Sequence, residues 1–141
     1  MNFADVTTGS VLPPLEVPLT KTLIIATAIA SRDYQEVHHD SDLARERGSK
    51  DIIMNILTTN GFVGRFVTDW AGPDAIIRSV KIRLGAPNYP GDTMTMTGEV
   101  TALDRDTRTA TVAVRGANSL GEHVNGTVEV TLPGSGGREW V

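Results

Sequence analysis

The stretch of sequence that decides the fold is residues 49–73, SKDIIMNILTTNGFVGRFVTDWAGP. Its apolar residues recur at intervals of three and four, which predicts one long helix that starts near Ser49 or Asp51 and ends at Gly72. The residues that set this spacing are Ile52, Ile53, Ile56, Leu57, Val63, Phe66, Val67 and Trp70. They spread widely around the helix axis, so we expect the helix to be buried on more than one side.

Glycines and polar residues interrupt the apolar pattern of this helix. Gly61 and Gly64 each weaken a helix by about 1 kcal/mol relative to alanine. Because glycine has no side chain, we expect both at positions where the sheet packs closely against the helix. Thr58, Thr59 and Asn60 are polar positions in an otherwise apolar helix. They face a pocket, bond across a dimer interface or lie on the surface, and the sequence leaves these alternatives open.

After residue 75 the spacing of apolar residues changes to two, which is typical of strands that bury one face. Four strands are predicted, separated by turn residues at 87–92, 104–106 and 118–121. Because the connections are short, we expect an antiparallel meander that wraps the helix. His123, at the start of the last strand, is expected at the surface or at a sheet edge. The apolar strand positions are Ile76, Val80, Ile82, Leu84, Met94, Met96, Val100, Ala102, Ala110, Val112, Val114, Val124, Val128, Val130 and Leu132.

The two ends of the chain bound the folded domain, which we place at residues 19–133. Residues 1–18 contain three prolines and are expected to form an extended arm on the surface. Residues 134–141 are rich in glycine and are expected to form a flexible tail. Inside the domain, residues 20–25 are predicted as the first strand, and residues 27–32 as a short helical turn.

Composition limits the class of protein. The chain has 141 residues, 40% hydrophobic and 21% charged, which fits one globular domain with a sizeable core. A net charge of -4 and scattered basic residues argue against nucleic-acid binding, and the absence of cysteine excludes disulfides and thiol nucleophiles. The longest apolar run, residues 23–30, is far shorter than the roughly 20 residues of a membrane-spanning helix, and the N-terminus lacks a signal pattern. We therefore expect a cytoplasmic protein that does not bind membranes.

A cluster of reactive side chains precedes the long helix. Residues 31–40 contain two of the three histidines, three carboxylates and an arginine. Asp33 and His38 are five residues apart, which is about 140° around a helix axis, so they meet only if the chain turns between them. A carboxylate accepts hydrogen bonds while neutral imidazole both donates and accepts, so the two can hold a water molecule for general acid-base chemistry.

Two other interpretations of this cluster stay open. It fits a solvated loop with a helix cap, because Asp, Ser, His and Gln are common in loops. It also offers His38, His39 and Asp40 as metal ligands. Adjacent histidines rarely converge on one ion, and no further ligand pair follows, so the metal site is the least favoured of the three interpretations and we expect no metal.

Taken in order, these features resemble the hotdog fold of the MaoC-like (R)-specific enoyl-CoA hydratases over about residues 19–132. The shared features are a strand, a buried helix wrapped by a meander, Asp33 and His38 before the helix, and a Pro-x-x-x-Gly-Asp turn at residues 87–92. The resemblance implies an α+β hotdog fold with an antiparallel sheet wrapped around a central helix. The segments 32–40, 48–52, 55–58 and 67–73 further resemble the small MaoC-like subunits of actinobacterial hydratases for steroid side chains.

The resemblance also implies roles for individual residues. Asp33 and His38 match the catalytic aspartate and histidine of the family. Asn55 matches a glycine whose backbone N–H binds the thioester oxygen. Gln35 and Glu36 replace the usual Asn and Pro of the motif Asp-x-Asn-Pro-x-His. A further departure is Val63, which stands at a family serine position. These departures bear on substrate shape more than on reaction class.

The predicted function is therefore the addition of water to the α,β-double bond of an enoyl-CoA, with a steroid side-chain thioester as the expected substrate. The resemblance implies no cofactor, because CoA is part of the substrate. It implies a second MaoC-like subunit, in a heterodimer or heterotetramer, while a homodimer stays possible. The alternatives are a hotdog acyl-CoA thioesterase, which needs no histidine partner, and a non-catalytic scaffolding subunit of a MaoC-like heteromer.

Overall fold

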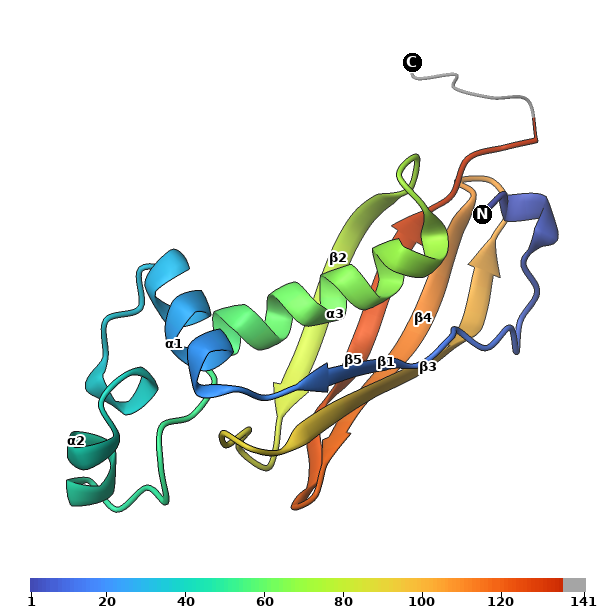
Figure 1. Cartoon of the computed structure of the whole chain (residues 1–141). Coiled ribbons are helices and arrows are strands. Elements are labelled where there is room, and N and C mark those ends of the chain that lie inside the picture. The colour runs from blue at the N-terminus through green and yellow to red at the C-terminus, as the bar shows by residue number, and fades with distance from the viewer. Residues whose placement is uncertain (136–141) are drawn as a thin grey trace.

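A five-stranded antiparallel sheet curves around one long helix, and two shorter helices lie at one end of that helix (Figure 1). The structure is a computed structural model that describes residues 1–135, so most of the predicted tail lies outside the described residues. This architecture confirms the predicted α+β class. The α-helices and strands are α1 (Lys21–Ala30), α2 (Ser41–Glu46), α3 (Ile56–Ala71), β1 (Leu15–Pro18), β2 (Ile76–Leu84), β3 (Thr93–Asp104), β4 (Thr109–Asn118) and β5 (Gly121–Thr131), with short 3-10 turns η1 (Phe3–Asp5) and η2 (Glu36–His38).

The strand order is β1-β3-β4-β5-β2, with antiparallel pairing throughout. Strands β3, β4 and β5 form the predicted meander, but β2 pairs with β5 rather than with its sequence neighbour β3. The prediction of a simple meander is therefore wrong at β2. The connection at residues 85–92 must cross the ends of β5 and β4 to reach β3, a distance of roughly 14 Å. Its eight residues can extend to roughly 26 Å, so it is long enough for this crossing.

The first helix corrects the sequence-based prediction of a strand at residues 20–25. Lys21–Ala30 is helical, and it is Thr20 that caps it, accepting a hydrogen bond from Leu23 N at 3.0 Å. The apolar run has no clear period, and its alanines favour a helix. The first strand comes earlier, at Leu15–Pro18, inside the predicted arm, where it pairs with β3.

The long helix starts later than its apolar spacing suggests. Residues 49–54 are not helical, and α3 begins after Asn55, whose side chain accepts a hydrogen bond from Thr58 N at 3.0 Å. The predicted cap Asp51 instead accepts hydrogen bonds from Ile52 N and from the Ser41 hydroxyl, both at 2.8 Å. These donors, the Ile52 N–H first, lower the pKa of Asp51.

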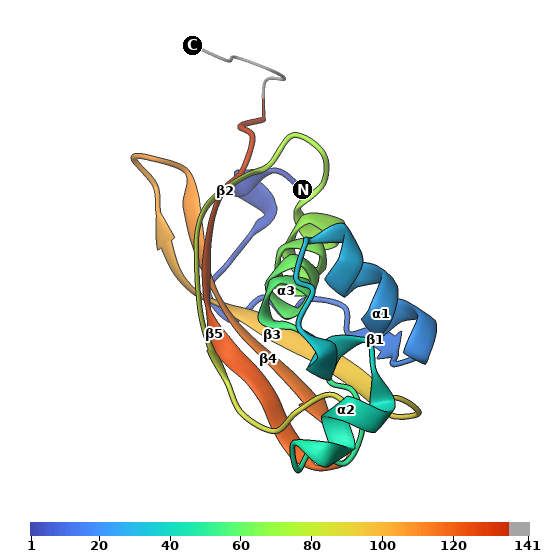
Figure 2. The same cartoon turned by 90° about the vertical axis from the view of Figure 1, so that its left-hand side faces the viewer.

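Helix α3 lies between the concave face of the sheet and α1 (Figure 2). Val63, Phe66 and Val67 are fully buried in the core, while Ile56 and Leu57 at the start of the helix are about half exposed. The core is thus built mainly on one face of α3. Among residues 1–135, no helix is both long and apolar enough to cross a membrane.

The expectation that glycines of α3 permit close packing of the sheet is wrong. A Cβ added at Gly61 would meet nothing within 4 Å, and one at Gly64 would meet only the Ile77 side chain, at an ordinary 3.7 Å. The close approach lies in β3, where a Cβ on Gly98 would lie 2.9 Å from both the Phe66 ring and the Ala113 carbonyl oxygen. It is the missing side chain of Gly98 that makes room for the helix.

Candidate active site

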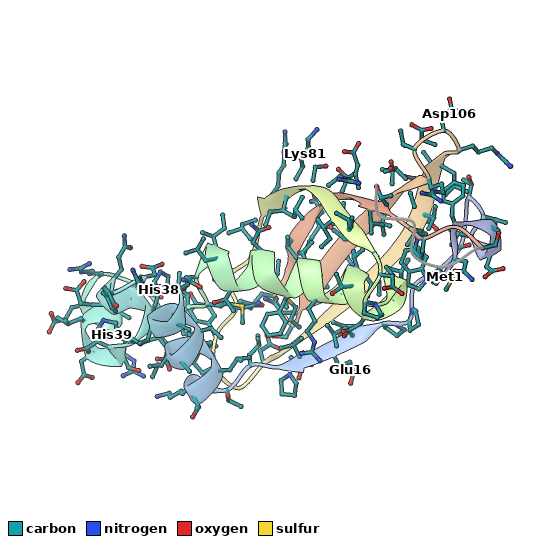
Figure 3. All side chains as sticks on the ribbon, turned by 90° about the horizontal axis from the view of Figure 1, so that it is seen from above. Met1, Glu16, His38, His39, Lys81 and Asp106 are labelled. Atoms are coloured by element: carbon teal, nitrogen blue, oxygen red, sulfur yellow. The ribbon has the colours of Figure 1, made fainter. Side chains whose placement is uncertain are left out.

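Asp33 and His38 lie in the chain between α1 and α3, and His38 is at the end of the molecule opposite Met1 (Figure 3). After α1, Arg32 adopts a left-handed conformation, with φ 58°, and Asp33 N donates to Ala28 O at 2.9 Å. Only a few per cent of residues other than glycine have positive φ, so this is a specific reversal of the chain. The reversal and the η2 turn bring His38 Nε2 to 3.3 Å from Asp33 Oδ2.

The hydrogen bonds of His38 fix which ring nitrogen carries the proton. Its Nδ1 lies 2.7 Å from the carbonyl oxygen of Ile53, which can only accept, so Nδ1 is the donor. In the neutral ring, Nε2 then presents a lone pair to the Asp33 carboxylate, which also only accepts. A shared proton, or a water molecule that donates to both atoms, satisfies this pair. The two side chains are 9% and 22% exposed, so the pair is shielded but reachable.

Asn55 joins this pair to the start of α3. Its side-chain Nδ2 donates to Asp33 Oδ2 at 3.1 Å and to Ser31 Oγ at 2.9 Å. Within the described part of the chain, no residue accepts a hydrogen bond from the backbone N–H of Asn55, Ile56 or Leu57. Such N–H groups at a helix start carry partial positive charge and can bind a developing oxyanion. The predicted role of the Asn55 N–H is compatible with this position and stays a prediction.

An apolar groove opens beside the pair, between α1 and α3. Its cavity volume is about 360 Å³. Ser31 and Thr58 line it, and both are hydrogen-bonded to Asn55, so the groove ends next to a residue that contacts Asp33, although Asp33 and His38 do not themselves line it. Thr58 is therefore one of the polar helix residues that faces a pocket. The other lining residues are Thr27, Ala30, Leu57, Gly61, Phe62 and Arg65.

His123 is buried, which corrects the prediction that it lies at the surface. Its Nδ1 donates to Ala86 O at 2.6 Å, and its Nε2 accepts from the Thr59 hydroxyl at 2.9 Å. Burial lowers the pKa of His123. In β5 the alternation of buried and exposed side chains fails at this point. The pairing of β5 with β4 shifts register between Gly116 and Ala117, and His123 and its neighbour Val124 are both buried as a result. A bulge of this kind leaves no clear signal in a single sequence.

The three side chains considered as metal ligands make separate contacts. His38 bonds to Ile53 O, while His39 Nε2 lies 3.1 Å from Tyr34 O. Asp40 caps α2 by accepting from Asp42 N and Leu43 N. Within residues 1–135, no group of three His, Asp or Glu side chains is placed to hold a metal ion. The approach of His38 to Asp33 is suited to proton transfer.

Comparison with known proteins gives a consistent result. The model of a family described as the MaoC like domain matches residues 2–123. The beta subunit of the 3-oxo-4,17-pregnadiene-20-carboxyl-CoA hydratase of Mycobacterium tuberculosis is 53% identical over 124 residues, which are 88% of this chain and 95% of that protein.

Solved structures show the same fold. A chain of the ChsH1-ChsH2 complex from Mycobacterium tuberculosis superposes with a TM-score of 0.87 at 52% identity, covering 90% of this chain and 98% of that one. The unliganded R-hydratase PhaJ1 from Pseudomonas aeruginosa superposes with a TM-score of 0.87 at 20% identity, covering 95% and 86%. The second likeness concerns the fold alone. Together they confirm the predicted hotdog fold.

Proposed function

Because this chain belongs to the MaoC-like domain family, we propose that it is the catalytic subunit of an enoyl-CoA hydratase. The proposed substrate is a steroid side-chain enoyl-CoA, and the proposed enzyme contains a second MaoC-like subunit. The observation that carries the proposal is the 3.3 Å approach of His38 Nε2 to Asp33 Oδ2 beside the start of α3. A carboxylate and an imidazole at this distance can bind one water molecule and transfer its protons.

The proposed reaction adds one water molecule across the α,β-double bond of the thioester. The Asp33–His38 pair removes a proton from the water while the water oxygen bonds to the β-carbon. The electrons of the double bond move toward the thioester oxygen, and the backbone N–H of Asn55 stabilises the enolate that forms. The pair then returns a proton to the α-carbon on the same face. No cofactor is needed for this reaction.

The size and lining of the groove between α1 and α3 favour a substrate with a bulky, apolar acyl group. Its volume of about 360 Å³ is of the size of a small-molecule site, and Leu57 and Phe62 contribute apolar walls. The Mycobacterium tuberculosis relative is named for a pregnadiene carboxyl-CoA, which carries a rigid polycyclic group. We therefore propose a polycyclic rather than a short linear acyl-CoA.

Two observations support a second subunit. The relative of known structure was solved as a complex of two different chains. Around the site, four large apolar side chains are exposed, and an isolated protein seldom leaves such a group uncovered. These side chains are Ile29, Tyr34, Ile56 and Leu57. We propose that a second MaoC-like subunit covers them.

The test is an assay of the chain co-purified with its partner from the native host. Short-chain, long-chain and steroid enoyl-CoA thioesters are followed by loss of enoyl absorbance, with free thiol measured in parallel. We expect hydration without thiol release, fastest with the steroid thioester. Thiol release with the double bond intact would instead identify a thioesterase. Full hydratase activity of the partner alone would identify this chain as a scaffold.

A further inference from the structure

We infer that the side chain of Asn55, and not only its backbone, positions the Asp33 carboxylate for catalysis. This inference rests on the proposed function. Asn55 is 2% exposed, and its amide lies between the catalytic pair and the first turn of α3. The Asn55 side chain is a positioning group, because it acts on the reaction through Asp33, whereas the proposed role of the backbone N–H is to contact the substrate directly.

The orientation of the Asn55 amide is fixed by the cap of α3. Its Oδ1 accepts from Thr58 N at 3.0 Å and also from the Thr58 hydroxyl. A backbone N–H can only donate, so the oxygen of the amide must face Thr58, and the NH₂ group must face the other way. The helix cap thereby decides which end of the amide meets Asp33.

Both hydrogens of that NH₂ group are used. One is donated to Asp33 Oδ2 at 3.1 Å and the other to Ser31 Oγ at 2.9 Å. Ser31 is itself fixed at the end of α1, where its hydroxyl donates to Thr27 O at 2.7 Å. The amide is therefore held by both helices and cannot turn without breaking several hydrogen bonds.

The same oxygen of Asp33 faces both Asn55 and His38. Oδ2 lies 3.1 Å from Asn55 Nδ2 and 3.3 Å from His38 Nε2, whereas among residues 1–135 the one donor to Oδ1 is Gln35 N at 3.4 Å. Without the amide, the carboxylate keeps only its longer contacts, with His38 Nε2 at 3.3 Å and with Gln35 N at 3.4 Å, among the described residues. Asn55 thus sets the orientation of the carboxylate in the acid-base pair.

The test compares three variants of this chain in the complex with its partner. Asn55→Ser keeps an oxygen that caps α3 but removes the amide donor. Asn55→Asp keeps the capping oxygen and the side-chain shape but places a second carboxylate beside Asp33. Asn60→Ser makes the same replacement at an exposed position of the same helix and is the matched control.

We expect Asn55→Ser to lower kcat about tenfold, with KM and the midpoint of urea unfolding near those of the wild type. Asn55→Asp should lower kcat further and move the acid limb of the pH profile to higher pH, because two adjacent carboxylates hold a proton more strongly. Asn60→Ser should behave as the wild type. Wild-type kcat in Asn55→Ser, or equal losses in both Asn55 variants with an unchanged pH profile, would overturn the inference.

A second measurement keeps the inference separate from the proposed function. The ring protons of His38 are followed by NMR as the pH is lowered, and this needs no substrate. At acidic pH, the change in the His38 ring-proton shifts should occur at higher pH in Asn55→Asp than in the wild type. If the wild-type complex does not hydrate enoyl-CoA but this movement is seen, the proposed function fails and the link from Asn55 to the pair stands. An unmoved titration would overturn the link.

Discussion

At the scale of single residues, the site depends on Asp33 Oδ2, which lies 3.1 Å from an amide nitrogen and 3.3 Å from an imidazole nitrogen. The imidazole of His38 is fixed by the Ile53 carbonyl, and the amide of Asn55 by the cap of α3. The imidazole and the amide are therefore each held by a main-chain group, and the amide in turn holds the Asp33 carboxylate. Such support keeps reacting groups in place without substrate.

Two glycines make a matched test of the packing between α3 and the sheet. Gly98→Ala places a Cβ 2.9 Å from both Phe66 and the Ala113 carbonyl oxygen, so we expect a loss of about 1–3 kcal/mol in the free energy of unfolding. Gly61→Ala meets nothing within 4 Å in a helix, so we expect a gain of up to about 1 kcal/mol. Urea unfolding measures both. Stability changes of the same sign would contradict the assignment of the close approach to Gly98.

Residue types made Asp33 and His38 a candidate pair, because a carboxylate and a histidine on one turn can act as an acid-base pair. The structure brings the two side chains to 3.3 Å, and their catalytic role stays a prediction. The side-chain role of Asn55 could not be found in the same way. Its amide matters because Ser31, Asp33 and Thr58 surround it, and these contacts depend on how α1 meets α3. The glycine prediction failed for a similar reason, since spacing does not show which face of a helix meets the sheet.

At the scale of elements, His123 joins α3, β5 and the connection at residues 85–92 through Thr59 and Ala86. Burial lowers its pKa, so the unfolded chain, with a histidine pKa of about 6.5, binds a proton more readily than the folded chain. This contribution to stability is complete above about pH 6.5 and is lost as the pH falls toward the folded-state pKa. The loss is limited to about 1.4 kcal/mol per pH unit.

We therefore expect the free energy of unfolding to fall more between pH 7.5 and pH 5.5 in the wild type than in His123→Gln. Urea unfolding at the two pH values gives the fall in free energy of unfolding for each protein. The other titrating groups are the same in both proteins, so the difference between the two falls reports on His123. An equal fall in the two proteins would show that His123 takes up its proton as easily in the folded state as in the unfolded one.

The sequence predicted strands β3 to β5 well because each carries buried residues at spacings of two between turn signals, and it found β2 from its apolar residues although none of them is fully buried. It failed at α1, where an apolar run without a clear period fits both a strand and a helix. It also placed the start of α3 too early, since Ile52 and Ile53 continue the apolar spacing although residues 49–54 are not helical. The pairing of β2 with β5 depends on a long connection, and local patterns do not specify such a crossing.

At the scale of the whole molecule, the large apolar side chains exposed around the site form the face that we propose a second subunit covers. Ile56→Glu tests this face, because a glutamate in the first turn of a helix does not disturb folding. We expect it to weaken binding of the second subunit at least tenfold, as measured by size exclusion with light scattering. Val11→Glu changes an exposed apolar residue outside this face and should leave assembly unchanged. Undiminished assembly of Ile56→Glu would place the interface elsewhere.

The most direct test of the account is the turnover number of the assembled complex carrying Asp33→Asn or His38→Ala. Each change removes one member of the proposed acid-base pair and leaves the core of the domain intact. The account predicts a fall in kcat of about a thousandfold for hydration of the enoyl-CoA, with assembly and unfolding midpoint close to those of the wild type. Hydration near the wild-type rate in either variant would contradict it.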